Sequence, residues 1–310
     1  MREIELVLEK CQEYYYNGDL EKAINLYEKN ESIVNSEGFD DNLKIQFHVA
    51  YIATLVVTIL MEGGSFDEIE KKILQCNELI TNKKSLEYAR VNLQHAIAWD
   101  YKPITKPEEK EENLDKATKL IDEVIVILEK LENTKYLSQA YFYRGLFFER
   151  RRQLEFAEKW YILSHQLAKE NNHPVEGSFA VRHLGFINMR RGNLKKCRDL
   201  LKESLKLRED AGFKIGIPYS ILSMGDINIL LKDYHNAMEF YKSGYDYAVS
   251  IRNKPAQLIG LTSIGRTHTR LEQFEEAVPY LENAIKLAEQ LGEDNLLAVA
   301  KKTLETQSTD

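Results

Sequence analysis

The sequence predicts an all-α superhelix of about seven helical hairpins, closed by a C-terminal helix. Three observations predict it: glycine recurs every 40 residues, other small and apolar residues keep the same register, and helix-breaking residues are few. The 310 residues include only six Pro and fifteen Gly, whereas Leu, Glu, Lys, Ala and Ile are plentiful, which favours helix. A hydrophobic content of 44% is enough to bury a continuous core.

The 40-residue period is clearest from residue 136 onward. Four stretches align without gaps, and their glycines are Gly145, Gly185, Gly225 and Gly265. A second small column keeps the same spacing with Ala157, Cys197, Ala237 and Ala277. Within each unit, apolar and small residues recur at steps of three and four, the spacing of one face of an α-helix. Each unit therefore predicts two amphipathic helices that touch at the small columns.

A less regular form of the unit can be traced upstream. Ala23, Ile69 and Ala117 occupy the column of Ala157, at steps of 46, 48 and 40 residues. The segment DYKPITKPEEKEEN (100–113) carries two prolines and an acidic run, which we expect to break the helix and to hold the additional length. We therefore divide one continuous solenoid into three irregular hairpins over residues 1–135, and four regular hairpins with the closing helix over residues 136–310.

Residues typical of turns recur with this period. The segments ENNHPVEG, EDAGFKIG and QLGEDN place Asn172, Gly212 and Gly292 in one column. Asn and Gly accept the left-handed conformation that ends many helices, so we expect helices to end there. The stretch RRGNLKKC (190–197) is predicted to be the turn between two helices of one unit, rather than a redox or nucleic-acid motif. Asp294 is the expected N-cap of the closing helix.

The pattern of Gly, a turn such as NGDL or RGNL, Ala, an aromatic residue or Leu, and a second small residue resembles the tetratricopeptide repeat. The resemblance covers most of residues 1–290. The 40-residue period exceeds the 34 residues typical of that repeat, and is similar to the extended type found in spindle-orientation adaptors and bacterial peptide-pheromone receptors. Arg144, Asn188 and Asn228 depart from the residues usual at their positions.

This resemblance implies a concave face, lined by the first helix of each hairpin, that binds a peptide or a folded protein. The candidate groove residues that it indicates are Phe142, Arg150, Phe179, Arg182, Phe186, Arg190, Tyr219, Asp226, Arg266 and Arg270. Aromatic rings offer apolar contact, and guanidinium groups suit carboxylates, so an acidic segment is a candidate ligand. Arg150 and Arg190 are expected to be neighbours that need a counter-charge.

A structural alternative stands beside this hypothesis. The arginines are then solvated charges near the turns, and Glu149 and Asp226 neutralise those that face inward. Tyr15 and Tyr16 are expected to face inward at the N-terminal end, as core or as groove wall.

Motifs for catalysis, metals or cofactors are not found in the sequence. Cys11, Cys76 and Cys197 lack paired spacing and fall in small columns, so we expect packing residues in a reducing compartment. The seven histidines make no metal-ligand spacing, and there is no phosphate loop, nucleophile elbow or dinucleotide fingerprint. We therefore predict a protein that is not an enzyme and that holds neither metal nor cofactor.

The formal net charge of −7 argues against generic nucleic-acid binding. The balance is uneven, because residues 1–135 hold 17 Lys or Arg against 27 Asp or Glu, whereas residues 136–310 hold 25 against 22. The charged N-terminus has no apolar signal core, and the longest apolar run, Val49–Met61, is too short to span a bilayer. We expect a cytoplasmic protein without membrane contact.

Three functions are weighed on these grounds. The leading hypothesis is a protein- or peptide-binding scaffold that uses the concave face. The first alternative is a peptide-responsive regulator that resembles bacterial pheromone receptors or response-regulator phosphatases. RNA binding through the arginine-rich segment is the third, and Glu149, Asp226 and the net charge weigh against it.

Overall fold

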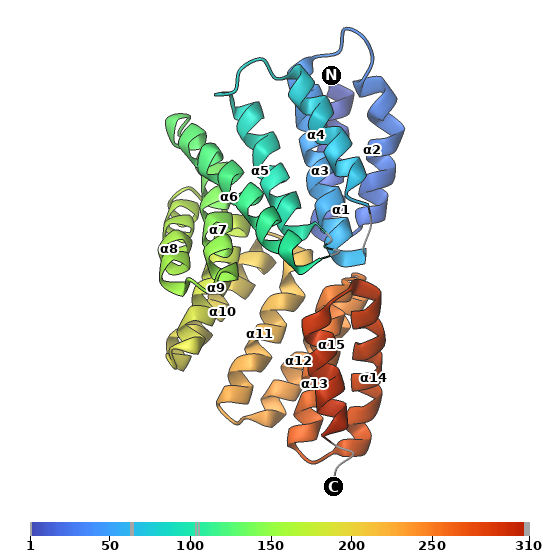
Figure 1. The fold of residues 1–310 in the computed structure, drawn as a ribbon, viewed down its shortest axis with the longest axis vertical. Helices are drawn as coiled ribbons and strands as arrows, with labels where there is room; N and C mark the ends of the chain where they lie inside the picture. Colours follow the sequence, from blue (N-terminus) through green and yellow to red (C-terminus); the bar gives the residue numbers. More distant parts are fainter. Residues whose placement is uncertain (1, 63–64, 103, 105, 307–310) are drawn as a thin grey trace. The chain divides into compact units, whose positions relative to one another are not determined.

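The computed structural model describes residues 2–306 except 63–64, 103 and 105. These residues form fifteen α-helices and one short 3₁₀ helix, without any strand (Figure 1). The α-helices are α1 (Arg2–Asn17), α2 (Leu20–Val34), α3 (Asp41–Glu62), α4 (Asp67–Leu79), α5 (Leu86–Tyr101), α6 (Pro107–Lys130), α7 (Thr134–Arg150), α8 (Leu154–Glu170), α9 (Pro174–Arg190), α10 (Leu194–Asp210), α11 (Ile217–Leu230), α12 (Tyr234–Ser250), α13 (Lys254–Arg270), α14 (Phe274–Leu291) and α15 (Asp294–Glu305). The 3₁₀ helix η1 (Lys214–Gly216) precedes α11.

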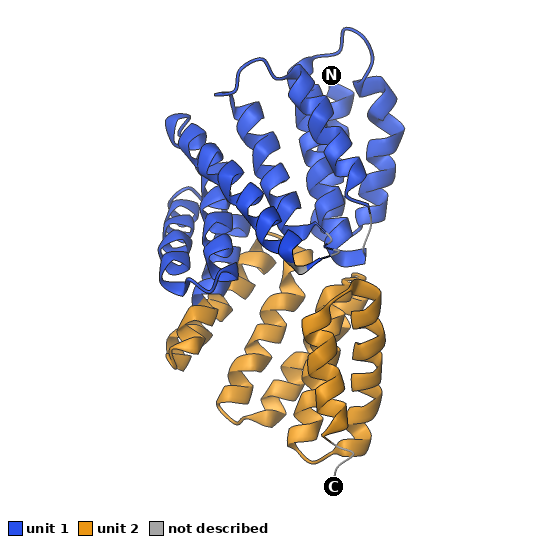
Figure 2. Cartoon of the chain, viewed as in Figure 1, with its two compact units in different colours: residues 1–184 blue, residues 185–310 orange. Residues whose placement is uncertain are grey.

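The order of these helices confirms the predicted fold class of seven hairpins and a closing helix, since α15 packs against α13 and α14. The chain divides into two compact units, residues 1–184 and residues 185–310 (Figure 2). The division predicted at residue 135 concerns the regularity of the repeat and stays a prediction.

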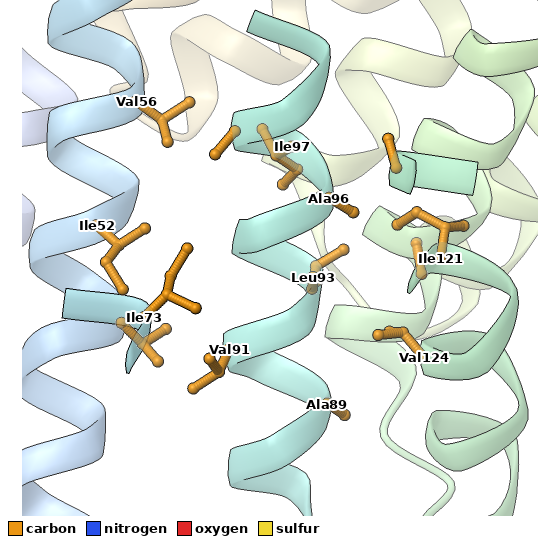
Figure 3. Close-up of a cluster of buried hydrophobic side chains, with 14 of the residues drawn as sticks. Ile52, Val56, Ile73, Ala89, Val91, Leu93, Ala96, Ile97, Ile121 and Val124 are labelled. Carbon is orange, nitrogen blue, oxygen red and sulfur yellow. The ribbon is translucent and has the colours of Figure 1, made fainter. Parts of the chain in front are cut away.

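The larger core of the first unit is centred on α5. In Figure 3, Val91 and Ile97 point toward the side of α3 and α4, while Ala89 and Ala96 point toward α6. These four side chains are at most 4% exposed. A helix buried on both sides needs apolar residues around most of its circumference, which explains why α5 lacks one clear polar face.

Helix α3 is longer than the apolar run that the sequence analysis singled out. Among the described residues it is the one helix with the length and hydropathy to cross a membrane, and half of its most apolar window is buried inside the unit. Its 22 residues correct the expectation of a segment too short for a bilayer. Phe47 and Tyr51 pack with Tyr27 of α2, and Ile52 and Val56 pack into the α5 core. These contacts account for the apolar composition.

Left-handed residues recur every 20 residues from 132 to 292, one after each helix. They are Glu132, Arg152, Asn172, Gly192, Gly212, Lys232, Arg252, Glu272 and Gly292, with φ between 51° and 76°. After α9, the amide of Asn193 donates to the carbonyl of Asn188 at 2.9 Å, which closes the turn. The predicted helix ends at Asn172, Gly212 and Gly292 are therefore confirmed, and RRGNLKKC is the turn between α9 and α10.

One local prediction was confirmed in part and another was wrong. The helix is interrupted within segment 100–113, since α5 ends at Tyr101 and α6 begins at Pro107, but the acidic run is not part of the break, because α6 runs through it. Proline suits the first turn of a helix, where its missing N–H is not needed, and acidic side chains there complement the helix dipole. Asp294 is the first helical residue of α15, and Glu293 occupies the N-cap.

Candidate functional site

In the first unit, Arg150 is paired within the chain. It stands at the end of α7, and its Nε and Nη2 donate to the two carboxylate oxygens of Asp100, at 2.9 and 2.8 Å. The Asp100 side chain is only 3% exposed, whereas that of Arg150 is 37% exposed. Burial acts to lower the pKa of Arg150, but the Asp100 carboxylate outweighs it and raises that pKa. The counter-charge expected from a ligand is thus supplied by α5.

Tyr101 and Tyr143 lie near this ion pair, and Tyr15 of α1 lies near both of these tyrosines. Burial raises the pKa of Tyr15 in α1 and of Tyr143 in α7, and the nearby Tyr101 raises both further. Asp100 and Arg150 also act on Tyr143, in opposite directions. We call Tyr15, Asp100, Tyr101, Tyr143 and Arg150 the Arg150 cluster. Tyr15 is half-buried, and its expected inward orientation stays a prediction. The sequence analysis did not connect it with Arg150.

Arg151, the next residue of this turn, is also paired. Arg151 binds Glu111 at 2.8 Å and Asp115 at 2.6 Å, both in the acidic first half of α6. Its Nη1 donates to Thr118 at 3.0 Å. The arginine-rich end of α7 is thus largely neutralised by carboxylates of the same unit, which weakens the case for RNA binding there.

Phe142 of α7 is buried among other aromatic rings. It is 5% exposed, and its ring centroid lies 5.4 Å from that of Phe179, 5.6 Å from that of Tyr161 and 5.2 Å from that of His183. Little of Phe142 is left for a ligand, whereas Phe179 is half-buried. Arg182, the fourth candidate in this unit, is half-buried on α9.

Next to these rings lies a polar contact of Glu149, Tyr161 and His183. The sequence analysis did not predict this contact. Glu149 accepts a hydrogen bond from the Tyr161 hydroxyl at 2.7 Å and lies 2.8 Å from Nδ1 of His183. Burial, and then Glu149, raise the pKa of Tyr161. Glu149 and His183 lie on the first helices of neighbouring hairpins, α7 and α9, so their proximity could have been proposed from the repeat register.

In the second unit, Asp226 and Arg266 shift the pKa of Tyr241 in opposite directions. Asp226 of α11 accepts a hydrogen bond from the Tyr241 hydroxyl at 2.7 Å. Burial and Asp226 raise the pKa of Tyr241, and Arg266 of α13 lowers it, so Arg266 lies near this pair. Asp226 and Arg266 hold the same column of successive repeats, and the register predicted that they face the same way.

Tyr219 is anchored to the next hairpin. Its hydroxyl donates to Asn253 Oδ1 at 3.0 Å, and Asn253 is fully buried and also caps α13 by accepting from the Ala256 amide at 3.1 Å. Of the remaining candidates in this unit, Arg190 and Arg270 are exposed and Phe186 is half-buried. Arg150 and Arg190 belong to different units, and their expected proximity stays a prediction.

The three cysteines are fully buried, in agreement with the packing role expected for them. Burial raises the pKa of Cys11 to about 11, of Cys76 to about 12 and of Cys197 to about 11. Buried thiols with raised pKa values are poor nucleophiles. Over the described ranges, no group of three or more His, Cys, Asp or Glu side chains could hold a metal ion.

Solved structures with the same fold are known. A Rap protein complexed with competence and sporulation factor is 12% identical with a TM-score of 0.69, over 99% of this chain and 87% of that one. NprR in complex with its cognate peptide NprX is 11% identical with a TM-score of 0.60, over 96% and 82%. A signal-transduction ATPase from Pyrococcus horikoshii with a tetratricopeptide repeat sensor is 12% identical with a TM-score of 0.61, over 94% and 43%.

Sequence comparison adds one partial match. No curated protein matches the chain. The family model described as anaphase-promoting complex subunit 5 matches residues 226–306, which is less than half of the chain. Together with the three solved structures, this match shows that the chain has a tetratricopeptide-like helical repeat fold.

Proposed function

We propose that this chain is a non-enzymatic scaffold that binds a peptide or a protein segment on the first helices of its hairpins. The observation that carries the proposal is the Arg150 cluster. Asp100 holds the guanidinium by two hydrogen bonds, so the side chain is already ordered before a ligand arrives. Ordering a long side chain in advance lowers the entropy that binding costs.

The chemistry of this cluster suits a peptide backbone. The guanidinium has five N–H groups, of which Asp100 takes two, and it is partly exposed. The remaining donors match backbone carbonyls or a carboxylate, and tyrosine rings add apolar area with a polar tip. Since Asp100 already balances the charge of Arg150, a ligand at this cluster does not have to be acidic.

The acidic segment is proposed for the second unit. There Arg190, Arg266 and Arg270 are exposed, and Asp226 is the one acidic residue among the candidates. An arginine that is not already held by a carboxylate can bind one from a ligand. We place the protein in the cytoplasm, without membrane contact or cofactor, and within the extended 40-residue class of the repeat.

The fold comparisons support this proposal without carrying it. According to their descriptions, one of the similar structures holds its cognate peptide and another holds competence and sporulation factor, and these statements apply to those proteins. The same likeness favours the second candidate function, a regulator whose conformation responds to a peptide. Hydrogen exchange with and without a bound peptide separates the two, because a regulator shows changes beyond the contact residues and a passive scaffold does not.

Selection from a random-peptide display library tests the proposal directly. Peptides that bind the wild-type protein are measured by fluorescence anisotropy against two variants. Arg266→Ala/Arg270→Ala removes two exposed first-helix cations, and Lys242→Ala/Lys286→Ala removes two exposed second-helix cations as a matched control. We expect at least about a tenfold loss with the first variant and little with the second, since a charge-assisted hydrogen bond contributes about 1.5–3 kcal/mol.

A parallel variant tests the first unit. Tyr15→Phe/Tyr143→Phe keeps the ring volume and removes two hydroxyls, so folding is preserved while polar contacts are lost. Selected peptides that bind all these variants as well as the wild type would overturn the proposal and move binding to the second helices.

A further inference from the structure

The second helix of the fifth hairpin carries a row of cations. Lys195, Arg198, Lys202 and Lys206 lie on α10 at steps of three and four, so they form one stripe that spans about 17 Å. All four are exposed, and Lys196 is exposed beside them. We call these five residues the α10 basic face. It belongs entirely to the second unit and does not include the candidate groove residues.

The repeat itself shows that the fold does not require this row. At the four stripe positions, the other second helices carry at most one Lys or Arg each. The equivalent residues are Asp115, Thr118, Asp122 and Val126 in α6; Glu155, Glu158, Ile162 and Gln166 in α8; His235, Met238, Lys242 and Asp246 in α12; and Glu275, Val278, Glu282 and Lys286 in α14. Packing constraints that are common to the repeat therefore do not explain the cations of α10.

The position of the row is unfavourable for α10 alone. Lys195 and Lys196 stand in its first turn, which holds no acidic residue, whereas the first turn of α8 has Glu155. The N-terminal end of a helix dipole is positive and repels cations. Like charges three or four residues apart repel one another as well, and the exposed Asp199, at that spacing from Lys195, Lys196 and Lys202, offsets part of this repulsion.

Nothing in the described chain offsets this charge by pairing. Lys195, Arg198 and Lys202 make no ion pair with any described residue. The arginine-rich end of α7 is the contrasting case, because there Arg150 and Arg151 are held by carboxylates at 2.6–2.9 Å. The α10 basic face thus keeps its charge available for a partner.

We propose that the α10 basic face docks a short acidic segment of another protein. Three or four carboxylates spaced over about 17 Å match the row, either on one side of a helix or on alternate residues of an extended strand. This surface is separate from the first helices, so the inference goes beyond the proposed function and does not depend on it.

The surroundings of the row favour a protein segment over other polyanions. No large hydrophobic side chain of α10 is exposed, so the face offers neither rings on which bases could stack nor apolar groups that could enter a lipid surface. A long nucleic acid would also extend past the row and meet a chain whose net charge is −7. A short segment feels mainly the row, because salt screens charges beyond about 8 Å at physiological ionic strength.

The test uses a fluorescein-labelled peptide of ten glutamates and the full chain, measured by anisotropy at low and physiological salt. The variant Lys195→Gln/Arg198→Gln/Lys202→Gln removes three charges of the row. The control Lys242→Gln/Lys286→Gln/Lys302→Gln removes three exposed charges elsewhere in the same unit. We expect binding to weaken at least about tenfold in the first variant and less than about threefold in the control, with a steep salt dependence in the wild type.

Folding does not confound this comparison. Glutamine is a good helix former, and the substitutions relieve repulsion, so the melting temperature of the first variant should not fall. Equal affinity of the peptide for wild type and variant would overturn the proposal. It would also be overturned if a ten-nucleotide single strand or an anionic vesicle bound the row more tightly than the peptide, or if the row held a second copy of this chain in sedimentation experiments.

Discussion

The regular hairpins, α7 to α14, and the irregular hairpins, α1 to α6, close their helix pairs with different chemistry. In the regular set, a glycine of the first helix lies directly under a ring or a leucine of the second. In the irregular set, Lys72 and His48 are buried between helices: the Lys72 side chain is 0% exposed and His48 is 1% exposed. The regular set also buries an ionisable side chain, Arg208 of α10, which is 1% exposed. Buried glycine contacts are sensitive to volume, and buried ionisable groups are sensitive to charge and pH.

Two contacts illustrate the contrast. A Cβ on Gly225 would lie 2.4 Å from Cε1 of Tyr241, which is closer than real Cβ atoms come to any heavy atom. The ammonium of Lys72 lies 2.9 Å from Glu31 and 3.0 Å from Glu68, and 4.2 Å from the centre of the Tyr51 ring. The comparison therefore predicts that a methyl group destabilises the first set and that acid or a lost charge destabilises the second.

The largest expected effect is in the regular set. Gly225→Ala should lower the free energy of unfolding by about 3 kcal/mol, because the added methyl overlaps the Tyr241 ring. The ring cannot move freely, since its hydroxyl is held by Asp226 at 2.7 Å. Urea denaturation followed by circular dichroism at 222 nm measures the change.

Gly185→Ala is the matched control for this substitution. Its Cβ would lie 3.0 Å from Cδ2 of Leu201, a flexible side chain that can yield. Alanine also gains about 1 kcal/mol over glycine inside a helix, so the net cost should stay below about 1 kcal/mol. Equal costs for both variants would show that the glycine columns do not reflect the fit of the partner side chain.

Acid should act on the irregular set through His48. Burial, and then the charge of Lys72, lower the pKa of this histidine to about 4. The unfolded chain, with an ordinary histidine pKa near 6.5, therefore takes up the proton first. The stability that the neutral form contributes is complete above pH 6.5 and is lost as the pH falls from 6.5 to 4. We expect the loss to be about 2.5 kcal/mol.

The difference between wild type and His48→Gln isolates this effect from the titration of carboxylates. Glutamine keeps an N–H donor for Asn35, whose Oδ1 lies 3.0 Å from His48 Nε2. The variant should lose less stability over the same pH range in urea denaturation. Parallel pH profiles for the two proteins would mean that His48 is not kept neutral by its surroundings.

Removing the buried ammonium should cost somewhat less. Lys72→Met keeps most of the side-chain volume and leaves Glu31 and Glu68 without their cation. These carboxylates are 25% and 43% exposed, so water compensates in part, and we expect a loss of about 1–2 kcal/mol. Lys71→Met is the control, because Lys71 is 64% exposed and 4.0 Å from Glu68, and it should cost less than about 0.5 kcal/mol.

The smallest effect is a gain at a turn of the regular set. Lys232 adopts φ 60° after α11, a position where the repeat has glycine in another hairpin, at Gly192. Lys232→Gly should raise the free energy of unfolding by about 0.5–1 kcal/mol, because glycine has no Cβ penalty in the left-handed region. The converse change, Gly192→Ala, should lower it by about 1 kcal/mol. Thermal denaturation of both variants shows whether each substitution stabilises or destabilises the protein.

The fold could be predicted from the sequence because its signals are local. The column of Gly145, the turn at Gly192 and the helix end at Gly292 all follow from the phase of a helix and from backbone conformation, which neighbouring residues set. The acidic residues after Pro107 were misassigned for the same reason. Their composition indicates a break, but their place in the first turns of α6 makes them favourable there.

Contacts between hairpins were harder to predict from the sequence. The pairing of Arg150 with Asp100 joins residues 50 positions apart, and that of Arg151 with Glu111 joins residues 40 apart. The repeat register places such residues on neighbouring helices but does not say which carboxylate is within reach. The counter-charge of Arg150 was therefore sought in a ligand, whereas the structure supplies it from α5.

By itself, the sequence determined the helical hairpins, their period, their turns and the faces on which residues lie. The reason is that the spacing of residues along a helix fixes the side of the helix on which each one lies. It also held a signal that was overlooked: Arg208 stands in the column of Ala168 and Ala248, and it is 1% exposed, whereas Arg198 in the same helix is exposed. Only the tertiary structure decided that Arg208 donates to the carbonyl of Gly216 and to Ser220, and that Arg150 meets Asp100. Such pairings depend on distances between helices to within about an ångström, which periodicity does not specify.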